Sequence, residues 1–140
     1  MLLASLLPAG CSTSAPEKLT IDDAQGRYPK ILSATAKRLT SQTGVIFTVV
    51  RHSTTQRFEN RCLYETDTLG TSSRLGVEIS WVEVIRGLGP ALSLEGFEDA
   101  VIQDVPGGHT GFDATDRYGA VLMARAKVTS TLVITAEVRC

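Results

Sequence analysis

Three cysteines are the residues of this 140-residue chain best suited to covalent chemistry, and they are Cys11, Cys62 and Cys140. Cys11 follows an apolar stretch over residues 2–7 and a pair of small residues. An apolar core followed by a small-residue cleavage site is typical of an export signal, and a cysteine directly after that site is typical of a bacterial lipoprotein. We therefore expect Cys11 to become the lipidated first residue of an exported domain on the outer face of the cell membrane.

Two features of this leader differ from the usual signal. It has no positively charged residue before the apolar core, and Pro8 stands where lipoprotein signals usually have Leu. One interpretation is that translation starts upstream of Met1. Export without lipidation is an alternative, and an apolar N-terminus that packs on the domain is another.

If Cys11 carries a lipid, Cys62 and Cys140 remain as an even pair. Because exported proteins meet an oxidising environment, we expect these two residues to form a disulfide. Closing so long a loop stabilises a protein by about 4 kcal/mol in the chain-entropy model, and the bond would also hold the last residue in place. The alternative is two buried thiols in a cytosolic protein.

Neither histidine, His52 nor His109, has the close His or Cys partners of a zinc site. The sequence also lacks G-x-S-x-G, S-x-x-K and G-x-G-x-x-G patterns. We therefore expect no metal, no cofactor and no enzymatic activity. An enzyme would require one of the histidines to converge with a carboxylate in a cleft.

Acidic side chains in the second half of the chain could bind calcium in an exported protein. They do not form the D-x-[DN]-x-[DN]-G run of a calcium loop, so we interpret them as turn formers and solvated strand positions. These residues are Glu98, Asp99, Asp104, Asp113 and Asp116.

The charge balance argues against a nucleic-acid partner. The chain has 14 Lys and Arg residues against 15 Asp and Glu residues, whereas nucleic-acid binding selects basic surfaces. Its 43% hydrophobic and 21% charged content is that of an ordinary globular protein and not of a disordered chain.

A first helix is predicted to begin after Thr20, an N-cap residue followed by the acidic pair Asp22 and Asp23. Apolar residues then recur at spacings of three, four and seven, which indicates one helical face. Pro29 is expected to kink or restart this helix, and Gly44 is expected to end it.

A second helix is predicted over residues 81–94, with Ser80 as its N-cap and Gly96 as its end. Trp81 leads its apolar face, and we interpret this side chain as a core anchor. The alternative is an apolar ligand groove between helix and sheet, lined by Trp81, Leu88 and Phe97.

Strands are predicted where β-branched residues or a period of two dominate. We expect them over residues 45–51, 57–66, 97–105, 109–116, 120–128 and 131–139. Residues 53–56 are expected to form the polar turn of a first hairpin, and residues 67–74 a loop.

These elements predict an α+β fold in the order αββαββββ. About six strands form an antiparallel sheet, and two helices lie on one of its faces. Residues 1–11 form the signal remnant ending in Cys11, residues 12–19 a flexible tether, and residues 20–140 a single domain.

The chain resembles small actinobacterial cell-envelope lipoproteins of the mycobacterial LppA-like type. The resemblance rests on a lipidated cysteine, a Ser/Pro tether, and short motifs in the strands and the second helix. The matching residues here are Cys11, Cys62, Ser80-Trp81, Gly96-Phe97, Asp116-Arg117-Tyr118-Gly119 and Cys140.

The resemblance implies a non-catalytic envelope domain without an active site. Our leading hypothesis is therefore a membrane-anchored domain with a structural or interaction role, whose partners are envelope proteins. The alternative hypothesis is a carrier or sensor that binds a small apolar or lipid-like ligand between helices and sheet.

Overall fold

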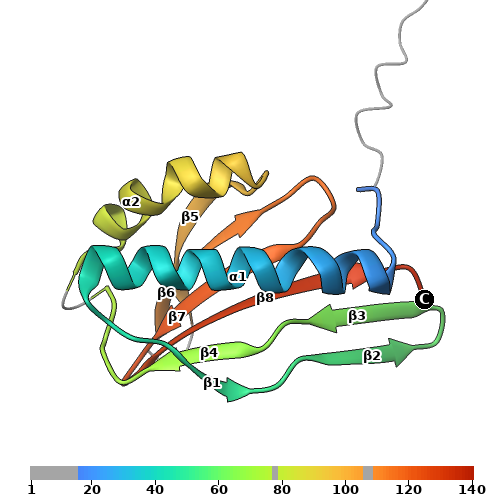
Figure 1. Cartoon of the computed structure of the whole chain (residues 1–140), viewed down its shortest axis with the longest axis horizontal. Coiled ribbons are helices and arrows are strands. Elements are labelled where there is room, and N and C mark those ends of the chain that lie inside the picture. The colour runs from blue at the N-terminus through green and yellow to red at the C-terminus, as the bar shows by residue number, and fades with distance from the viewer. Residues whose placement is uncertain (1–15, 77–78, 106–108) are drawn as a thin grey trace, which may run out of the picture.

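The computed structural model describes residues 16–76, 79–105 and 109–140. These residues form two helices and eight strands, and both helices lie on the same face of one sheet (Figure 1). The elements are α1 (Ile21–Thr43), β1 (Thr48–Arg51), β2 (Thr54–Phe58), β3 (Arg61–Glu65), β4 (Thr68–Thr71), α2 (Trp81–Leu94), β5 (Glu98–Val105), β6 (His109–Thr115), β7 (Val121–Ala126) and β8 (Ser130–Val138).

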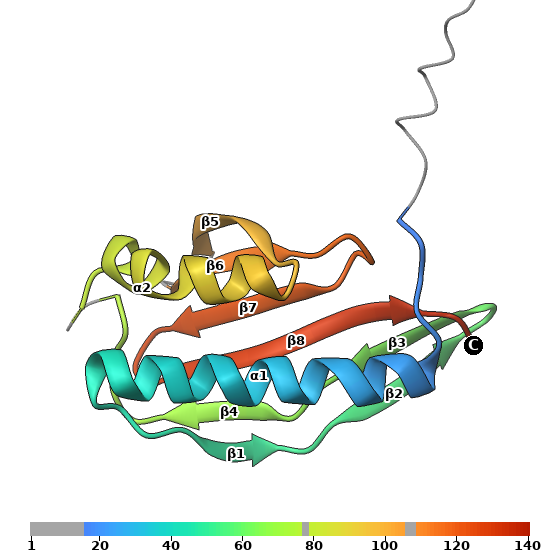
Figure 2. The same ribbon diagram turned by 45° about the horizontal axis from the view of Figure 1, so that its top comes forward.

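All strand pairs of the sheet are antiparallel, and the strand order across it is β1-β4-β8-β7-β6-β5. The strands β2 and β3 continue the sheet beside the other half of β8, because β2 pairs with β3 and β3 pairs with β8. Figure 2 shows α1 running along β8, while α2 lies over β5 and β6. The predicted α+β class, with two helices on one face of an antiparallel sheet, is therefore confirmed.

The predicted number of six strands is wrong, since the described residues form eight in the order αββββαββββ. The additional strands come from interruptions of a single long hairpin. Arg51 pairs with Thr68 and Thr54 pairs with Glu65, so the same register continues across the break at residues 52–53 and 66–67. Each arm of this hairpin is thus divided in two, and β2 and β4 lie mostly or wholly outside the expected strands 45–51 and 57–66.

The predicted turn at residues 53–56 is also wrong, because residues 54–56 belong to β2. The hairpin turns instead at Glu59 and Asn60, where Glu59 has a positive φ of 54°. Every residue of β2 is exposed, and its residues before Phe58 are all polar, so the composition of this edge strand resembles that of a turn.

A short strand also occupies part of the expected loop 67–74. β4 pairs with β1 on one side and β8 on the other, although it is only four residues long. Its Gly70 faces the side chain of Val50, and a Cβ atom there would lie 2.8 Å from Val50 Cγ1. Close packing of Val50, from the edge strand β1, therefore explains why a glycine stands here, although a glycine in the sequence suggests a loop.

The first helix begins and ends where its capping residues predict. The Thr20 side chain accepts a hydrogen bond from the Asp23 backbone N–H at 3.1 Å, and Gly44 ends the helix with a φ of 81°. The helix is continuous through Pro29, so the restart considered for that position does not occur. None of the helices in the described part of the chain is long and apolar enough to cross a membrane.

The second helix has the predicted bounds. Ser80 caps it by accepting a hydrogen bond from the Glu83 backbone N–H at 3.2 Å. Gly96 follows it with a φ of 82°, and the Phe97 N–H then donates to the Leu92 carbonyl at 2.8 Å. This returns the chain to the sheet with Phe97 buried beneath the helices.

A buried carboxylate connects α1 to the turn between β6 and β7. The Tyr28 hydroxyl donates to Asp116 Oδ2 at 2.7 Å, and the backbone N–H groups of Tyr118 and Ala120 donate to Oδ1 at 2.9 Å each. Burial raises the pKa of Tyr28, and its hydrogen bond to Asp116 raises it further. Tyr28 therefore remains a donor across the physiological pH range.

We predict that Tyr28→Phe lowers the free energy of unfolding by about 2 kcal/mol, because a hydrogen bond to a buried carboxylate is lost. Urea denaturation measures this change. Tyr118→Phe is the matched control, since the Tyr118 hydroxyl contacts only the exposed Arg117 among the described residues and should be dispensable. Equal stability of the two variants would contradict the role given to Tyr28.

Candidate functional site

An open groove of about 900 Å³ runs between α1 and the β1–β4 side of the sheet. One wall comes from α1 residues at spacings of three and four, which follow one line along the helix. These wall residues are Pro29, Leu32, Ala36 and Thr40. Ser33, Lys37 and Ser41, each one position further round the helix, form a polar rim above them.

The floor of the groove is apolar and comes from the sheet and the segment that leads into it. Tyr64 of β3 is buried, Leu69 of β4 is half-buried, and Val49 of β1 is 48% exposed. Phe47 and Ile46 extend the floor toward the end of α1, and Ile46 is 72% exposed. The groove thus presents apolar side chains to water without a covering element among the described residues.

Two charged residues line the groove, and their surroundings differ. Asp67 Oδ1 accepts the backbone N–H of Ser53 at 2.8 Å, so this carboxylate already holds the break in the hairpin. Burial raises the pKa of the Tyr64 hydroxyl, and the nearby charge of Asp67 adds to this shift. Lys37 forms no ion pair or hydrogen bond with any residue that the structure describes. The groove therefore has one carboxylate that accepts a backbone N–H and one ammonium group without a partner among the described residues.

The residues predicted to line a ligand groove are all buried in the core. Trp81 is 6% exposed, and Leu88 and Phe97 are 0% and 1% exposed. Trp81 packs edge-on against Phe112 and donates to Thr110 Oγ1 at 3.0 Å. None of the three predicted residues lines the groove described above, and Trp81 has the position of a core anchor.

Sequence reasoning missed the groove, although one signal for it exists. The apolar residues of α1 are more numerous than a narrow stripe requires, since Pro29, Leu32 and Ala36 flank the line through Tyr28, Ile31, Thr35 and Leu39. A helix with so wide an apolar face can contact both the sheet and something beside it. The exposed Val49 of the edge strand gives no comparable signal, because an isolated exposed valine is common.

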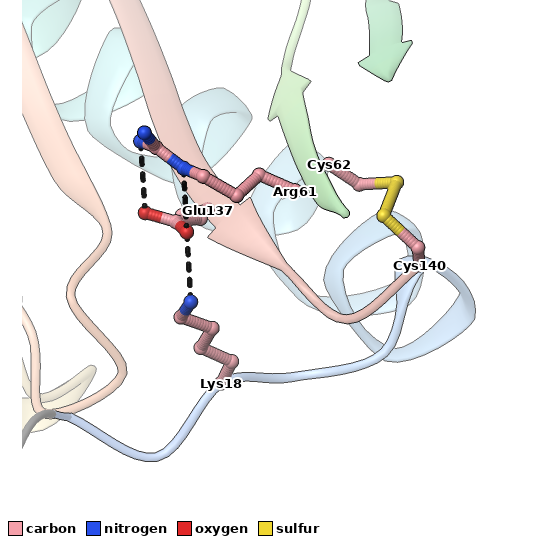
Figure 3. The surroundings of a disulfide bond; sticks show 5 residues. All are labelled: Lys18, Arg61, Cys62, Glu137 and Cys140. Atoms are coloured by element: carbon pink, nitrogen blue, oxygen red, sulfur yellow. Dashed lines mark hydrogen bonds and ion pairs between the residues drawn. A yellow bond between two sulfur atoms is a disulfide. The ribbon is translucent and has the colours of Figure 1, made fainter. Parts of the chain in front are cut away.

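A disulfide joins Cys62 of β3 to Cys140 at the end of the chain, with the two Cα atoms 5.3 Å apart (Figure 3). Cys62 is 3% exposed and lies opposite Val138 of β8 in the sheet. The bond therefore fixes the last residue to the strand beside β8.

The first described residues are held at this same end. Glu137 Oε1 binds Lys18 Nζ at 2.7 Å and Arg61 Nε at 3.1 Å, as Figure 3 shows. The Arg139 N–H donates to the Leu19 carbonyl at 2.9 Å, and Thr20 forms a parallel bridge with Arg139. Lys18 and Leu19, which belong to the expected tether 12–19, thus contact the domain, whereas Cys11 lies outside the described residues.

Other candidate groups do not assemble into a site. His52 is exposed at the break between β1 and β2, and His109 is the first residue of β6. Asp113 pairs with Arg125 at 2.7 Å, and Asp116 binds Tyr28. Within the described ranges, no three His, Cys, Asp or Glu residues are placed to hold a metal ion.

Two solved structures share this fold. One is a DUF4853 family protein from Actinomyces odontolyticus, with a TM-score of 0.63 at 16% identity, covering 91% of this chain and 72% of that protein. The other is the putative lipoprotein LppA from Mycobacterium tuberculosis, with a TM-score of 0.61 at 10% identity, covering 84% of this chain and 76% of that one. No family model and no curated protein matches the sequence. The chain therefore has an LppA-like fold.

We predict that Cys62→Ser with Cys140→Ser lowers the free energy of unfolding by about 4 kcal/mol, because the bond closes a loop with a sequence separation of 78 residues. Urea denaturation under non-reducing conditions measures the loss. Cys11→Ser is the control and should leave stability unchanged. A double variant as stable as the parent would contradict a stabilising disulfide.

A second prediction concerns how the stability of the domain changes as the pH is lowered. Hydrogen bonds from Lys18 and Arg61 lower the pKa of Glu137 below its ordinary value of 4.5. A carboxylate with a lowered pKa stabilises the fold above its unfolded pKa, and this contribution is lost as the pH falls through the folded pKa. Glu137→Gln should therefore be less stable than the parent at pH 6, and the difference should shrink below about pH 4.5.

Urea midpoints measured between pH 3 and pH 6 test this dependence. Glu98→Gln is the control, because Glu98 is exposed and forms no ion pair among the described residues. A Glu137→Gln difference that stays constant across this range would exclude titration of Glu137 as its cause.

Proposed function

We propose that this chain is an exported, lipid-anchored domain without catalytic activity, which has a structural or interaction role on the outer face of the cell membrane. Cys11 carries the lipid in this proposal. The observation that supports it best is the position of Lys18 and Leu19, which are fixed beside the Cys62–Cys140 disulfide. A chain anchored at Cys11 would pull on the end of the domain that is covalently locked.

The fold comparison supports the same compartment. The neighbour from Mycobacterium tuberculosis is described as a lipoprotein, and the one from Actinomyces odontolyticus belongs to a family named only as a domain of unknown function. Neither description names an enzyme activity. The buried polar network around Asp116 holds the β6–β7 turn and joins it to α1, and therefore serves the fold.

A second candidate function is that of a carrier or sensor for a small apolar ligand. The groove between α1 and β1–β4 supports it, because its floor exposes Ile46 and Val49 to water. This function is compatible with the anchor, since the groove and the disulfide end use different residues.

The anchor is tested by metabolic labelling with a fatty acid in a bacterial host that exports and lipidates proteins. We expect the parent chain to incorporate the label and Cys11→Ala to lose it, because acylation requires that thiol. The Cys62→Ala and Cys140→Ala double variant is the matched control and should keep the label. Labelling of Cys11→Ala at the parent level would refute the anchor.

A further inference from the structure

We propose that the groove between α1 and β1–β4 binds a single-chain amphiphile, with its apolar chain on the floor and its anionic end at Lys37. The proposal gives the second candidate function above a ligand class and a binding orientation. It rests on that function and is independent of lipidation at Cys11.

The dimensions of the groove favour a small, elongated ligand. Its volume of about 900 Å³ lies at the upper end of the range for small-molecule sites, which is about 300–1,000 Å³. The α1 wall extends from Pro29 to Ser41, and at 1.5 Å per residue this corresponds to about 18 Å. An extended chain fills such a shape better than a compact molecule does.

The polarity of the groove sets the orientation of the ligand. Leu69 and Val49 lie on the floor of the groove and Leu32 on its α1 wall, while hydroxyl groups and Lys37 lie at the α1 rim. A chain laid along the bottom would remove exposed apolar surface from water, which is the main driving force for such binding. Its polar end would remain at the rim.

Lys37 provides a partner for the anionic end of the ligand at the rim of the groove. Neither Lys37 nor Asp67 has an ion pair in the part of the chain that the structure describes, but Asp67 accepts the Ser53 N–H, whereas Lys37 has no hydrogen-bond partner there. An ammonium group without a partner can bind a carboxylate or a phosphate at the mouth of the groove.

A peptide that added a strand to the sheet fits the groove less well. Such a peptide would pair with the outer edge of β1, in the plane of the sheet. It would leave the floor at Leu69 uncovered, because Leu69 belongs to β4, the strand next to β1 in the sheet.

Binding is tested on the full chain carrying Cys11→Ser, so that no attached lipid competes. The probe is 11-(dansylamino)undecanoate, a fluorescent fatty acid, displaced by tetradecanoate. We expect saturable binding at one site per chain. Val49→Glu should weaken it at least tenfold, because an uncompensated charge would lie in the apolar floor.

Val50→Glu is the matched control. Val50 follows Val49 on the same strand and is 60% exposed, but its side chain meets Gly70 and does not line the groove. Thermal unfolding of both variants establishes that they are folded. Equal weakening by the two variants would overturn the assigned floor, and so would an absence of saturable binding by the folded parent.

The anionic end is tested with Lys37→Gln. We expect about fivefold weaker binding of tetradecanoate and unchanged binding of tetradecanol, because only the first ligand pairs with the ammonium group. Lys30→Gln, on α1 but outside the groove, is the control and should bind as the parent does. If Lys37→Gln weakened the binding of tetradecanol as strongly as that of tetradecanoate, the role of Lys37 would be overturned.

The source of the anionic end is distinguished by comparing tetradecanoate with a lysophosphatidate of the same chain length. Tighter binding of tetradecanoate identifies a fatty acid, and tighter binding of the lysophosphatidate identifies a single-chain phospholipid. Each outcome supports an anionic single-chain amphiphile. If neither displaces the probe, the amphiphile is refuted. The proposed lipid anchor is untouched by that result, because every chain in this experiment lacks Cys11.

Discussion

The hydrogen bond from Tyr28 to the buried carboxylate of Asp116 is the interaction on which the arrangement of α1 depends. It joins residues 88 positions apart in the sequence and crosses from the helix to the β6–β7 turn. Two backbone N–H groups occupy the other carboxylate oxygen, so Asp116 fixes the turn and the helix together. Pro29 follows Tyr28 directly, and the groove begins there. The position of the groove wall is thus a consequence of this buried contact.

The width of the sheet explains why a groove exists beside α1. Six strands lie side by side at about 4.8 Å, so the sheet is about 24 Å across, whereas two helices of about 10 Å diameter cover about 20 Å. α2 lies over β5 and α1 lies along β8. The part of the sheet that the helices do not fully cover is therefore on the β4 and β1 side. An interior strand would normally be covered on its apolar face. Here the partly uncovered strands are short, and their exposed side chains become the floor of the groove.

The sequence predicts the helices of this protein well because their ends are determined locally. Thr20, Gly44 and Ser80 satisfy backbone groups within a few residues of themselves, and such capping is visible without any tertiary information. The divided hairpin was missed because β2 is exposed on both faces and has no period of two. The groove was missed for another reason. Leu69 and Pro29 line the same groove only because α1 packs across the sheet, and no spacing along the chain reveals that arrangement.

The strand β3 connects the disulfide to the groove. Cys62 and Tyr64 alternate onto the same face of this strand, and both pair with β8, opposite Val138 and Ala136. The disulfide at Cys62 therefore fixes the register that brings Tyr64 to the floor of the groove. Because a shift of one residue would turn Tyr64 to the opposite face, the disulfide also maintains the shape of the groove. In an exported protein this bond is formed by the environment in which the groove would be used.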